Sequence, residues 1–320
     1  MTPSFSVVIP AYKRMDLLER TIHHLVQQDY PADHYEVLAV DHAGGEAGGV
    51  VERFAAARCV VRRVECAAVS AMAKRNEGAR LGTGDYVLFH NDDIWPAPNL
   101  LTEHARTHAR YAPEPVAVLG HVDQSPEMPA TPFIEAYRPY AYAQLEGLHD
   151  QPVRWWYFYA PNVSLPRREM VEGGFFFRED WPELVHEDVE LGYRWCNAGH
   201  KLVYNAHATA EHYHPHTLAS AARLQESLGR HLPKLEQLVP EPRLTERYGV
   251  FSWRNGKRAV VRGLVRRALF NTLTLPAVEG WLERQRRNTP LSRWLYWKVL
   301  LHYTDRGYRQ GQRLYGSGAG

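Results

Sequence analysis

Two short acidic clusters hold the residues best suited to chemistry in this chain of 320 residues. In the first, Asn91, Asp92 and Asp93 follow an apolar run typical of a buried strand, so two carboxylates are expected at the mouth of a sheet. Hard divalent cations take oxygen ligands and can bridge them to phosphates. An aspartate after a strand can also simply cap the next turn. The cluster therefore predicts either a cation site or an ordinary turn.

The second cluster, His186-Glu187-Asp188, opens a predicted helix. Acidic residues in a first helical turn are favoured by the helix dipole, so N-terminal capping is one interpretation. The other is a general base, because a carboxylate near an acceptor hydroxyl can take its proton during attack. Spacing alone does not decide between the two.

Histidines gather late in the sequence, at His207, His212, His214 and His216. Imidazoles at i and i+2 of an extended segment share one face, an arrangement that suits metal ligation. No His-Glu-x-x-His or Cys-x-x-Cys pattern accompanies them to specify a zinc site. A solvated or structural histidine-rich segment is the alternative.

An aromatic run spans residues 155–159. Aromatic faces suit the apolar face of a pyranose, so these rings could stack on a sugar. They could equally fill the core of the protein.

The first half of the chain alternates between predicted strands and predicted helices, and this alternation would place the first acidic cluster at the edge of a sheet. Predicted strands cover residues 5–10, 35–40, 59–65 and 85–90, and predicted helices cover residues 15–28, 50–58 and 71–81. This alternation predicts parallel crossovers in a doubly wound α/β sheet. Ligands bind beyond the carboxyl ends of such strands, where the chain places Pro10 to Tyr12, Asp41 and His90 to Asp93.

The second half of the chain is less regular. We expect a helix from Pro98 to Tyr111, a strand over 116–122, a helix over 186–198 and a strand over 201–206. Residues 125–182 are rich in proline and aromatic side chains and are expected to be irregular. Beyond Leu218 the pattern is largely helical.

Taken in order, these segments resemble the family-2 glycosyltransferases of GT-A fold. SVVIPAYKRMDLL is similar to the opening strand and turn of the family, AKRNEGAR to its Arg-Asn-x-Gly segment, and HNDD to its DxD motif. APNVSLPRR resembles the acceptor-side segment, and HEDVELGYRWCNAGHKLVY resembles the Glu-Asp motif with the passage after it. The resemblance covers about residues 5–230. It implies a Rossmann-like, mostly parallel central sheet flanked by helices, with a C-terminal helical extension.

The resemblance also implies the domains and the site. Residues 1–220 would form the GT-A catalytic domain, with 1–93 as the nucleotide-binding half and 94–220 as the acceptor half, followed by a basic helical region over 221–320. The implied nucleotide-sugar contacts are Pro10, Ala11, Tyr12, Arg14, Asp41, Arg75, Asn91 and Asp92. Asp92 and His214 would hold the metal, Asp188 would be the base, and Trp156, Asn162 and Glu187 would contact the acceptor. His90 replaces the first aspartate of the DxD motif, which predicts a weaker metal site than an intact motif.

The implied activity is inverting transfer of a hexose from a nucleotide-diphosphate sugar, with a UDP-sugar as the first expectation. The acceptor would be a hydroxyl of a saccharide or lipid-linked glycan, as in polysaccharide biosynthesis, and Mg²⁺ or Mn²⁺ would assist. The alternative is a nucleotide-sugar-binding protein with weak or no transferase activity. Nucleic acid is not an expected partner, because the chain contains no recognised reader motif.

Net charge divides the chain into two unlike parts. The formal charge of +2 conceals a balance of +11 over residues 253–320, which leaves −9 over residues 1–252. Residues 257–269 place apolar side chains on one half of a helix with arginines at its borders, and residues 290–303 add tryptophans and tyrosines. We expect residues 253–303 to contact an anionic membrane surface or, alternatively, the acidic first part of the chain. Three cysteines without a pairing pattern, and a first segment unlike a signal peptide, favour a cytoplasmic protein. Contact with an anionic membrane would then place it peripherally on the inner face of the cell membrane.

Overall fold

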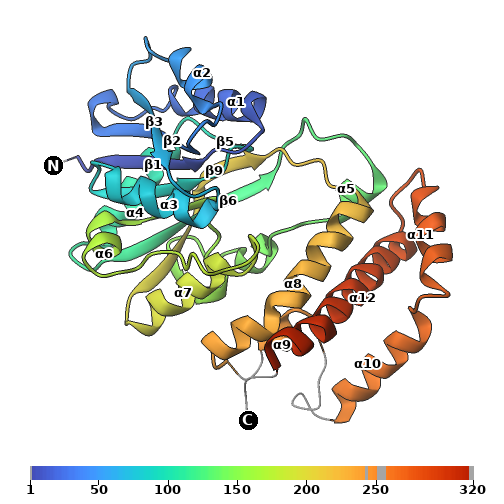
Figure 1. The fold of residues 1–320 in the computed structure, drawn as a ribbon. Helices are drawn as coiled ribbons and strands as arrows, with labels where there is room; N and C mark the ends of the chain where they lie inside the picture. Colours follow the sequence, from blue (N-terminus) through green and yellow to red (C-terminus); the bar gives the residue numbers. More distant parts are fainter. Residues whose placement is uncertain (1, 242–243, 251–256, 317–320) are drawn as a thin grey trace. The chain divides into compact units, whose positions relative to one another are not determined.

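A computed structural model describes residues 2–241, 244–250 and 257–316 (Figure 1). The chain forms two compact units. The first comprises Met1–Glu127 with Tyr140–His214, and the second comprises Met128–Pro139 with Pro215–Gly320. Each unit has its own core and is described separately below.

The first unit begins with four parallel strands in the order β3-β2-β1-β4. Their bounds are β1 Phe5–Pro10, β2 Tyr35–His42, β3 Val60–Cys66 and β4 Tyr86–His90. The connecting helices are α1 Met15–Leu25, the short η1 Ala32–His34, α2 Ala47–Glu52 and α3 Ala71–Leu81. The predicted strands and their parallel pairing are confirmed. The predicted helix over 50–58 instead begins and ends earlier, as α2.

Continuous apolar runs explain why these strands lie in the interior. Phe5, Val7, Val8 and Ile9 of β1 are fully buried, as expected for a strand covered on both faces. Helix α1 buries Leu18, Ile22 and Leu25, which recur at helical spacing on one face. The strand ends are thereby fixed at one edge of the sheet.

Beyond β4 the sheet becomes mixed. Its full order is β3-β2-β1-β4-β8-β6-β9-β5, with β7 paired to β9. The remaining strands are β5 Ile94–Pro96, β6 Val116–Gln124, β7 Gln151–Val153, β8 Asn162–Pro166 and β9 Lys201–His212. Strand β8 is antiparallel to β4 and β6, whereas β6 and β9 are parallel. The helices of this part are α4 Leu100–Tyr111, η2 Tyr142–Leu145, η3 Trp155–Tyr157, α6 Arg167–Val171 and α7 Glu187–Asn197.

The expectation that residues 125–182 are irregular was wrong for several segments, above all for β8. This strand is only five residues long and is buried over Asn162–Leu165, so it has neither the length nor the polar alternation that marks a strand in sequence. Its place in the middle of the sheet depends on pairing with β4 and β6, which are distant in sequence. The expected strand over 201–206 also continues to His212, as β9.

The second unit is helical. Its helices are α5 Pro132–Ala136, α8 Leu218–Leu238, α9 Leu244–Arg247, α10 Lys257–Leu269, α11 Leu275–Glu283 and α12 Pro290–Tyr315. Thr217 and Thr289 cap α8 and α12 by accepting from the backbone N–H of Ser220 and Ser292. The two long helices run side by side (Figure 1).

The apolar core of the second unit joins α5 to the C-terminal helices. Phe133 and Tyr137 stack at 5.1 Å and pack with Phe270, Tyr296 and neighbouring aliphatic side chains. Among the described residues, no helix is both long and apolar enough to cross a membrane. Residues 253–256 of the predicted membrane-contact segment lie outside the described residues.

Candidate active site

The acidic turn between β4 and β5 is buried and held in place on both sides. Asp92 and Asp93 are 3% and 2% exposed. The Thr21 hydroxyl on α1 donates to the Asp92 carbonyl at 2.8 Å, and the Tyr213 N–H donates to the Asp93 carbonyl at 2.9 Å. Both carboxylates are therefore positioned by a rigid turn at the carboxyl end of β4.

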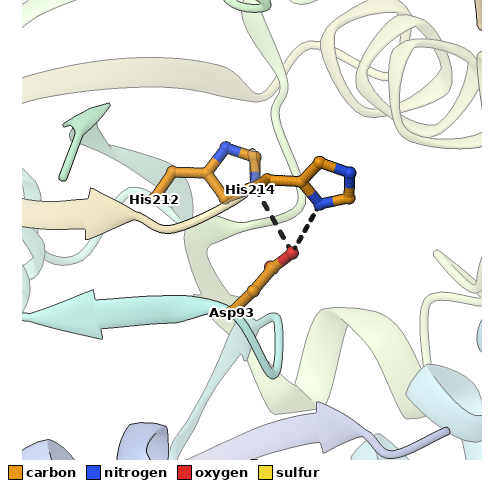
Figure 2. Close-up of side chains that lie close together, drawn as sticks. All are labelled: Asp93, His212 and His214. Atoms are coloured by element: carbon orange, nitrogen blue, oxygen red, sulfur yellow. Dashed lines mark hydrogen bonds and ion pairs between the residues drawn. The ribbon is translucent and has the colours of Figure 1, made fainter. Parts of the chain in front are cut away.

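Asp93 lies against two histidines from the end of β9 (Figure 2). Its Oδ2 is 3.0 Å from His214 Nδ1 and 3.4 Å from His212 Nε2. One ligand atom from each of the three residues lies within 4.8 Å of the others. Asp93 Oδ1 is buried and accepts no hydrogen bond from any described residue. A cation could therefore be held by one carboxylate and two imidazoles.

Electrostatics keep Asp93 ionised. Burial alone would raise the pKa of Asp93, but hydrogen bonds with His212 and His214 and the charge of Arg14 hold it well below its usual range. A permanently anionic carboxylate beside two imidazoles is a donor set that suits a divalent transition metal.

The predicted metal ligands were Asp92 and His214, and the structure arranges them differently. His214 lies beside Asp93, whereas Asp92 faces Arg14, whose Nε donates to Asp92 Oδ2 at 3.2 Å. Arg14 Nη1 also donates to Asp93 Oδ2 at 2.6 Å, so one guanidinium bridges both carboxylates. Burial raises the pKa of Asp92 to about 6 despite this contact. His212 belongs to the predicted histidine group but not to the implied ligand pair, and the i, i+2 alternation along an extended segment is the signal that identifies both histidines.

His90 plays a structural part in place of the missing aspartate. It is fully buried, its Nε2 lies 3.1 Å from the carbonyl of Ile94 across the turn, and it pairs with Asn162 in the β4–β8 register. Burial lowers the pKa of His90 to about 4, so the ring is neutral. It closes the turn that carries Asp92 and Asp93.

Asp41 organises the loops at the ends of β1 and β2. It is 1% exposed, and its carboxylate accepts from the N–H groups of His42 at 2.8 Å and Ala47 at 3.1 Å and from Lys74 Nζ at 3.2 Å. Burial would raise the pKa of Asp41, but these donors lower it. A Cβ at Gly45 would lie 2.1 Å from Asp41 Oδ2, so the loop approaches this closely only with glycine there.

The other predicted nucleotide contacts surround Asp41. Pro10 ends β1, and Ala11 is buried with its carbonyl accepting from Lys74 Nζ at 2.6 Å. Tyr12 is 44% exposed and is the aromatic residue of these three; its ring centre lies 5.0 Å from Lys13 Nζ and 5.5 Å from Lys74 Nζ. Lys74 was not predicted. Lys74 is buried on α3 and links the residue after β1 to Asp41. Its position directly before Arg75 in the Arg-Asn segment is the one signal in the sequence for this role.

Arg75 and Glu187 form a buried ion pair between α3 and α7. Arg75 is 2% exposed, its Nη1 donates to Glu187 Oε1 at 3.1 Å, and its Nη2 donates to Asn91 Oδ1 at 3.0 Å. Asn91 directly precedes Asp92, and Glu187 directly precedes Asp188. This chain of contacts joins the two acidic clusters that are far apart in sequence.

Asp188 lies at the start of α7 with an altered acidity. Its Oδ1 accepts from the Val189 N–H at 2.7 Å and its Oδ2 from the Ala160 N–H at 3.4 Å. Burial raises the pKa of Asp188 to about 7, the charge of Glu187 adds to the rise, and Arg75 opposes it. His186, in the left-handed region at φ 65°, turns the chain into the helix. A carboxylate poised near neutrality is suited to take up a proton.

The predicted acceptor contacts lie in different environments. Trp156 is partly exposed, with the Arg154 guanidinium 5.0 Å from its ring centre, whereas Tyr157, Phe158 and Tyr159 of the same run are buried. Asn162 is fully buried, donates to the Ala208 carbonyl at 2.9 Å and lies 2.9 Å from His104 Nε2 through Oδ1. It fastens β8 to β9 within the sheet, so it presents no surface to an acceptor in this conformation. Glu187 is occupied by Arg75.

Known proteins match both the sequence and the fold. Residues 3–226 match the family described as "Glycosyltransferase like family 2". The chain is 26% identical over 266 residues to validoxylamine A glucosyltransferase of Streptomyces hygroscopicus subsp. jinggangensis, covering 75% of this chain and 63% of that protein. The protein of the same name from subsp. limoneus matches equally over 58% of its length. The chain thus spans less than two thirds of the curated relatives it matches.

Solved glycosyltransferases share the fold at low sequence identity. The mannosyltransferase PcManGT from Pyrobaculum calidifontis, in complex with GDP-Man and Mn²⁺, superposes with a TM-score of 0.64 at 19% identity, covering 97% of this chain and 87% of that chain. TarS 1-349 from S. aureus in complex with UDP-GlcNAc gives 0.56 at 14% identity, covering 96% and 92%. Given the family match over residues 3–226 and this likeness of fold, the chain belongs to glycosyltransferase family 2 and has the GT-A fold.

Proposed function

We propose that the chain is an inverting glycosyltransferase that moves a hexose from a nucleotide-diphosphate sugar to an acceptor hydroxyl, with Asp188 as the general base. The observation that carries the proposal is the network from the Asp92–Asp93 turn through Asn91, Arg75 and Glu187 to Asp188. It links a cluster that could hold a cation to a carboxylate whose pKa is raised to about 7.

Asp93, His212 and His214 are the proposed ligands of a divalent metal. The unpartnered Asp93 Oδ1 and the two converging imidazoles support this assignment. Imidazole ligands favour a transition metal such as Mn²⁺ over Mg²⁺, which prefers oxygen alone. When bound, the ion supplies positive charge that stabilises a leaving diphosphate. Arg14 contacts the Asp93 carboxylate and would add its positive charge beside the metal site.

Asp188 would remove the acceptor proton as the acceptor oxygen attacks the anomeric carbon. The new bond forms from the acceptor oxygen to that carbon while the bond from the carbon to the diphosphate oxygen breaks. The proton passes to Asp188, and the electron pair leaves with the diphosphate. A single displacement inverts the anomeric centre and needs no enzyme nucleophile.

Donor and acceptor are proposed from the surfaces around these groups. Tyr12 offers an exposed ring for the nucleotide base beside the loop held by Asp41. The solved neighbours were in complex with GDP-Man and with UDP-GlcNAc, and a UDP-sugar is the donor we propose to test first. Trp156 is the proposed ring for a saccharide or lipid-linked glycan. We also propose an anionic membrane surface as a partner of the basic C-terminal segment within residues 253–303.

The test is a transfer assay with a panel of nucleotide sugars and saccharide acceptors in the presence of Mn²⁺. Asp188→Asn is expected to lower turnover by about 10²- to 10⁴-fold while donor affinity, measured by calorimetry, stays within a factor of about two. The product of the unmodified enzyme is expected to have the inverted anomeric configuration by NMR. Asp33→Asn, at an exposed position in η1, serves as the matched control.

Three results would overturn the assignment: unchanged turnover in Asp188→Asn, a product of retained configuration, or an equal loss in Asp33→Asn. If donors bind but no acceptor supports transfer, the chain is a nucleotide-sugar-binding protein instead.

A further inference from the structure

An apolar groove lies within the second unit, between α10 and the first half of α12. Its volume is about 650 Å³, within the range of sites that hold small organic ligands. Val265, Leu269 and Phe270 line one side, and Trp294, Trp297 and Leu301 line the other. Every described residue that lines the groove belongs to the second unit.

The two walls continue outward as exposed apolar side chains. On α10, Val261, Leu264, Val265 and Leu269 are 54–58% exposed, and on α12 Trp294 and Trp297 are 48% and 58% exposed. Monomeric soluble proteins rarely expose contiguous apolar surface of this kind, and where they do it commonly marks a binding surface. Tryptophans on a basic amphipathic face favour the boundary between water and lipid.

Charge distinguishes between an anionic partner and a second copy of the chain. Among the described residues that line the groove, Arg247, Arg266 and Lys298 are basic, and Glu246 is the one carboxylate. Nearby, the single carboxylate of Asp305 is shared by Arg266 at 3.5 Å, Arg267 at 2.8 Å and Arg309 at 3.4 Å. Three arginines around one carboxylate give these four side chains a net positive charge. A second copy would bring the same positive charge to the interface, whereas an anionic group would be attracted.

We propose that the α10–α12 groove takes an acyl chain of an anionic phospholipid at a bilayer surface, with Arg247 and Lys298 facing the head group. The proposal deepens the membrane contact proposed above and rests on it, but it does not depend on the transfer chemistry. The membrane contact proposed above is a general attraction to a charged surface, whereas the groove is one defined apolar site. The lipid chain would cover the apolar walls, and the arginine and lysine stems would extend along it toward the phosphate.

The test is co-sedimentation of the intact chain with vesicles of phosphatidylcholine alone or with a quarter phosphatidylglycerol. We expect binding to the anionic vesicles only, and at least tenfold weaker binding by Val265→Asp. Val69→Asp, which is 53% exposed in the first unit, is the matched control and is expected to bind like the unmodified chain. Equal binding by Val265→Asp, equal binding to neutral vesicles, or an equal loss in Val69→Asp would overturn the proposal.

Fluorescence quenching by lipids brominated on the acyl chain checks the site directly. Quenching is expected to fall in Trp294→Phe/Trp297→Phe and to persist in Trp281→Phe, because Trp281 is exposed on α11 but does not line the groove. Unchanged quenching in the double variant would refute the site. Sedimentation equilibrium without vesicles must show a monomer, because a dimer that Val265→Asp dissociates would assign the groove to a second copy.

The same variants separate this proposal from the proposed function. Val265→Asp is expected to keep transfer to a water-soluble saccharide acceptor, which also shows that it is folded. If the unmodified chain lacks transfer but vesicle binding depends on Val265, the groove assignment stands and the proposed activity fails. If transfer is intact and vesicles do not bind, the groove assignment fails alone.

Discussion

Three carboxylates of the first unit, Asp92, Asp93 and Asp188, differ in acidity because their neighbours differ. Asp93 is held well below its usual pKa, whereas Asp92 rises to about 6 and Asp188 to about 7. Asp93 contacts two imidazoles and a guanidinium, while Asp188 accepts from two backbone N–H groups and lies beside Glu187. Environments that separate acidities in this way assign one carboxylate to charge binding and another to proton transfer.

The acidity of Asp188 predicts the pH dependence of the reaction. A base must be deprotonated, so kcat/KM is expected to rise with pH and to level off above about pH 7. The measurement is the pH profile at saturating Mn²⁺. A profile that is flat between pH 5 and 8 would exclude Asp188 as the base.

Asp188 should also make the stability of the fold depend on pH. In contrast to the activity, the stability is expected to fall as pH rises. The folded-state pKa of Asp188 is raised, so its contribution to stability is complete below the unfolded pKa and is lost as pH rises through about 7. Asp188→Asn does not ionise, and its Tm relative to the unmodified chain is therefore expected to increase from pH 5 to pH 8. A relative Tm that falls over this interval would contradict the shift. The scan also verifies that the inactive variant is folded.

Glu187 should tune Asp188 through its charge. Because Glu187 raises the pKa of Asp188 and Arg75 lowers it, Glu187→Gln is expected to move the inflection of the pH profile to lower pH. The Gln side chain retains an acceptor for Arg75, so the α3–α7 contact can persist. Glu172→Gln, at the exposed residue that follows α6, should leave the inflection unmoved. An unmoved inflection in Glu187→Gln would show that the pair is merely structural.

The contacts of the two turn aspartates predict unequal roles in metal binding. Asp93→Asn is expected to weaken Mn²⁺ binding by more than the roughly 10- to 100-fold that loss of an outer partner costs. Asp92→Asn should weaken it less, because Asp92 faces Arg14 rather than the imidazoles. Calorimetric titration of Mn²⁺ measures both. A larger loss of Mn²⁺ affinity in Asp92→Asn than in Asp93→Asn would instead support Asp92 as the ligand, as expected from the sequence.

At the scale of elements, α8 and α12 approach each other through glycines. A Cβ at Gly307 would lie 1.9 Å from the Glu226 carbonyl, and one at Gly311 would lie 2.0 Å from the Arg230 carbonyl. Across the same contact, a Cβ at Gly229 would lie 2.0 Å from the carbonyl of Thr304. Backbone atoms block these positions, so the helices can pack this closely only without side chains there.

Gly307→Ala is therefore expected to destabilise the protein, by about 1–3 kcal/mol. Gly280→Ala is the matched control, because a Cβ there meets nothing within 4 Å and the position lies inside α11. Alanine at this site should stabilise the helix by about 0.5–1 kcal/mol. Urea unfolding of the two variants gives opposite shifts in midpoint if the glycine contact is as described. Shifts of the same sign would refute it.

At the scale of the whole molecule, binding of a nucleotide sugar should raise the thermal stability of the first unit. A donor that binds only the folded chain raises its stability by about 2.7 kcal/mol at one hundred times its Kd. We expect a nucleotide sugar to raise the Tm in the presence of Mn²⁺ and much less after chelation. Thermal scans across uridine and guanosine diphosphate sugars would identify the base. A rise that is the same with and without metal would argue against cation-assisted donor binding.

The division of charge also belongs to this scale. The acidic part of the chain contains the proposed machinery, and the +11 over residues 253–320 falls in the unit that holds the apolar groove. Composition alone leaves an anionic surface and the acidic first part as rival partners. The exposure of the apolar walls beside the basic residues favours a lipid.

The sequence by itself determined the parallel half of the sheet and the order of the motifs. Apolar runs and helical spacing are local properties, so β1 to β4, α1 and α3 follow from short windows. The carboxyl ends of parallel strands must share an edge, which is why Asp41 and the turn at Asp92 were predictable as residues at the edge where ligands bind in sheets of this kind.

Only the tertiary structure decided which of these residues meet. Strand β8 is inserted by pairing with strands far away in sequence, and it buries Asn162 inside the sheet. Asp93, and not Asp92, lies with His212 and His214 because the two adjacent carboxylates point in different directions. The pairing of Arg75 with Glu187 joins residues 112 positions apart. Contact and burial set the acidity of Asp188, and neither is encoded in a local pattern, because both arise only when distant segments exclude water together.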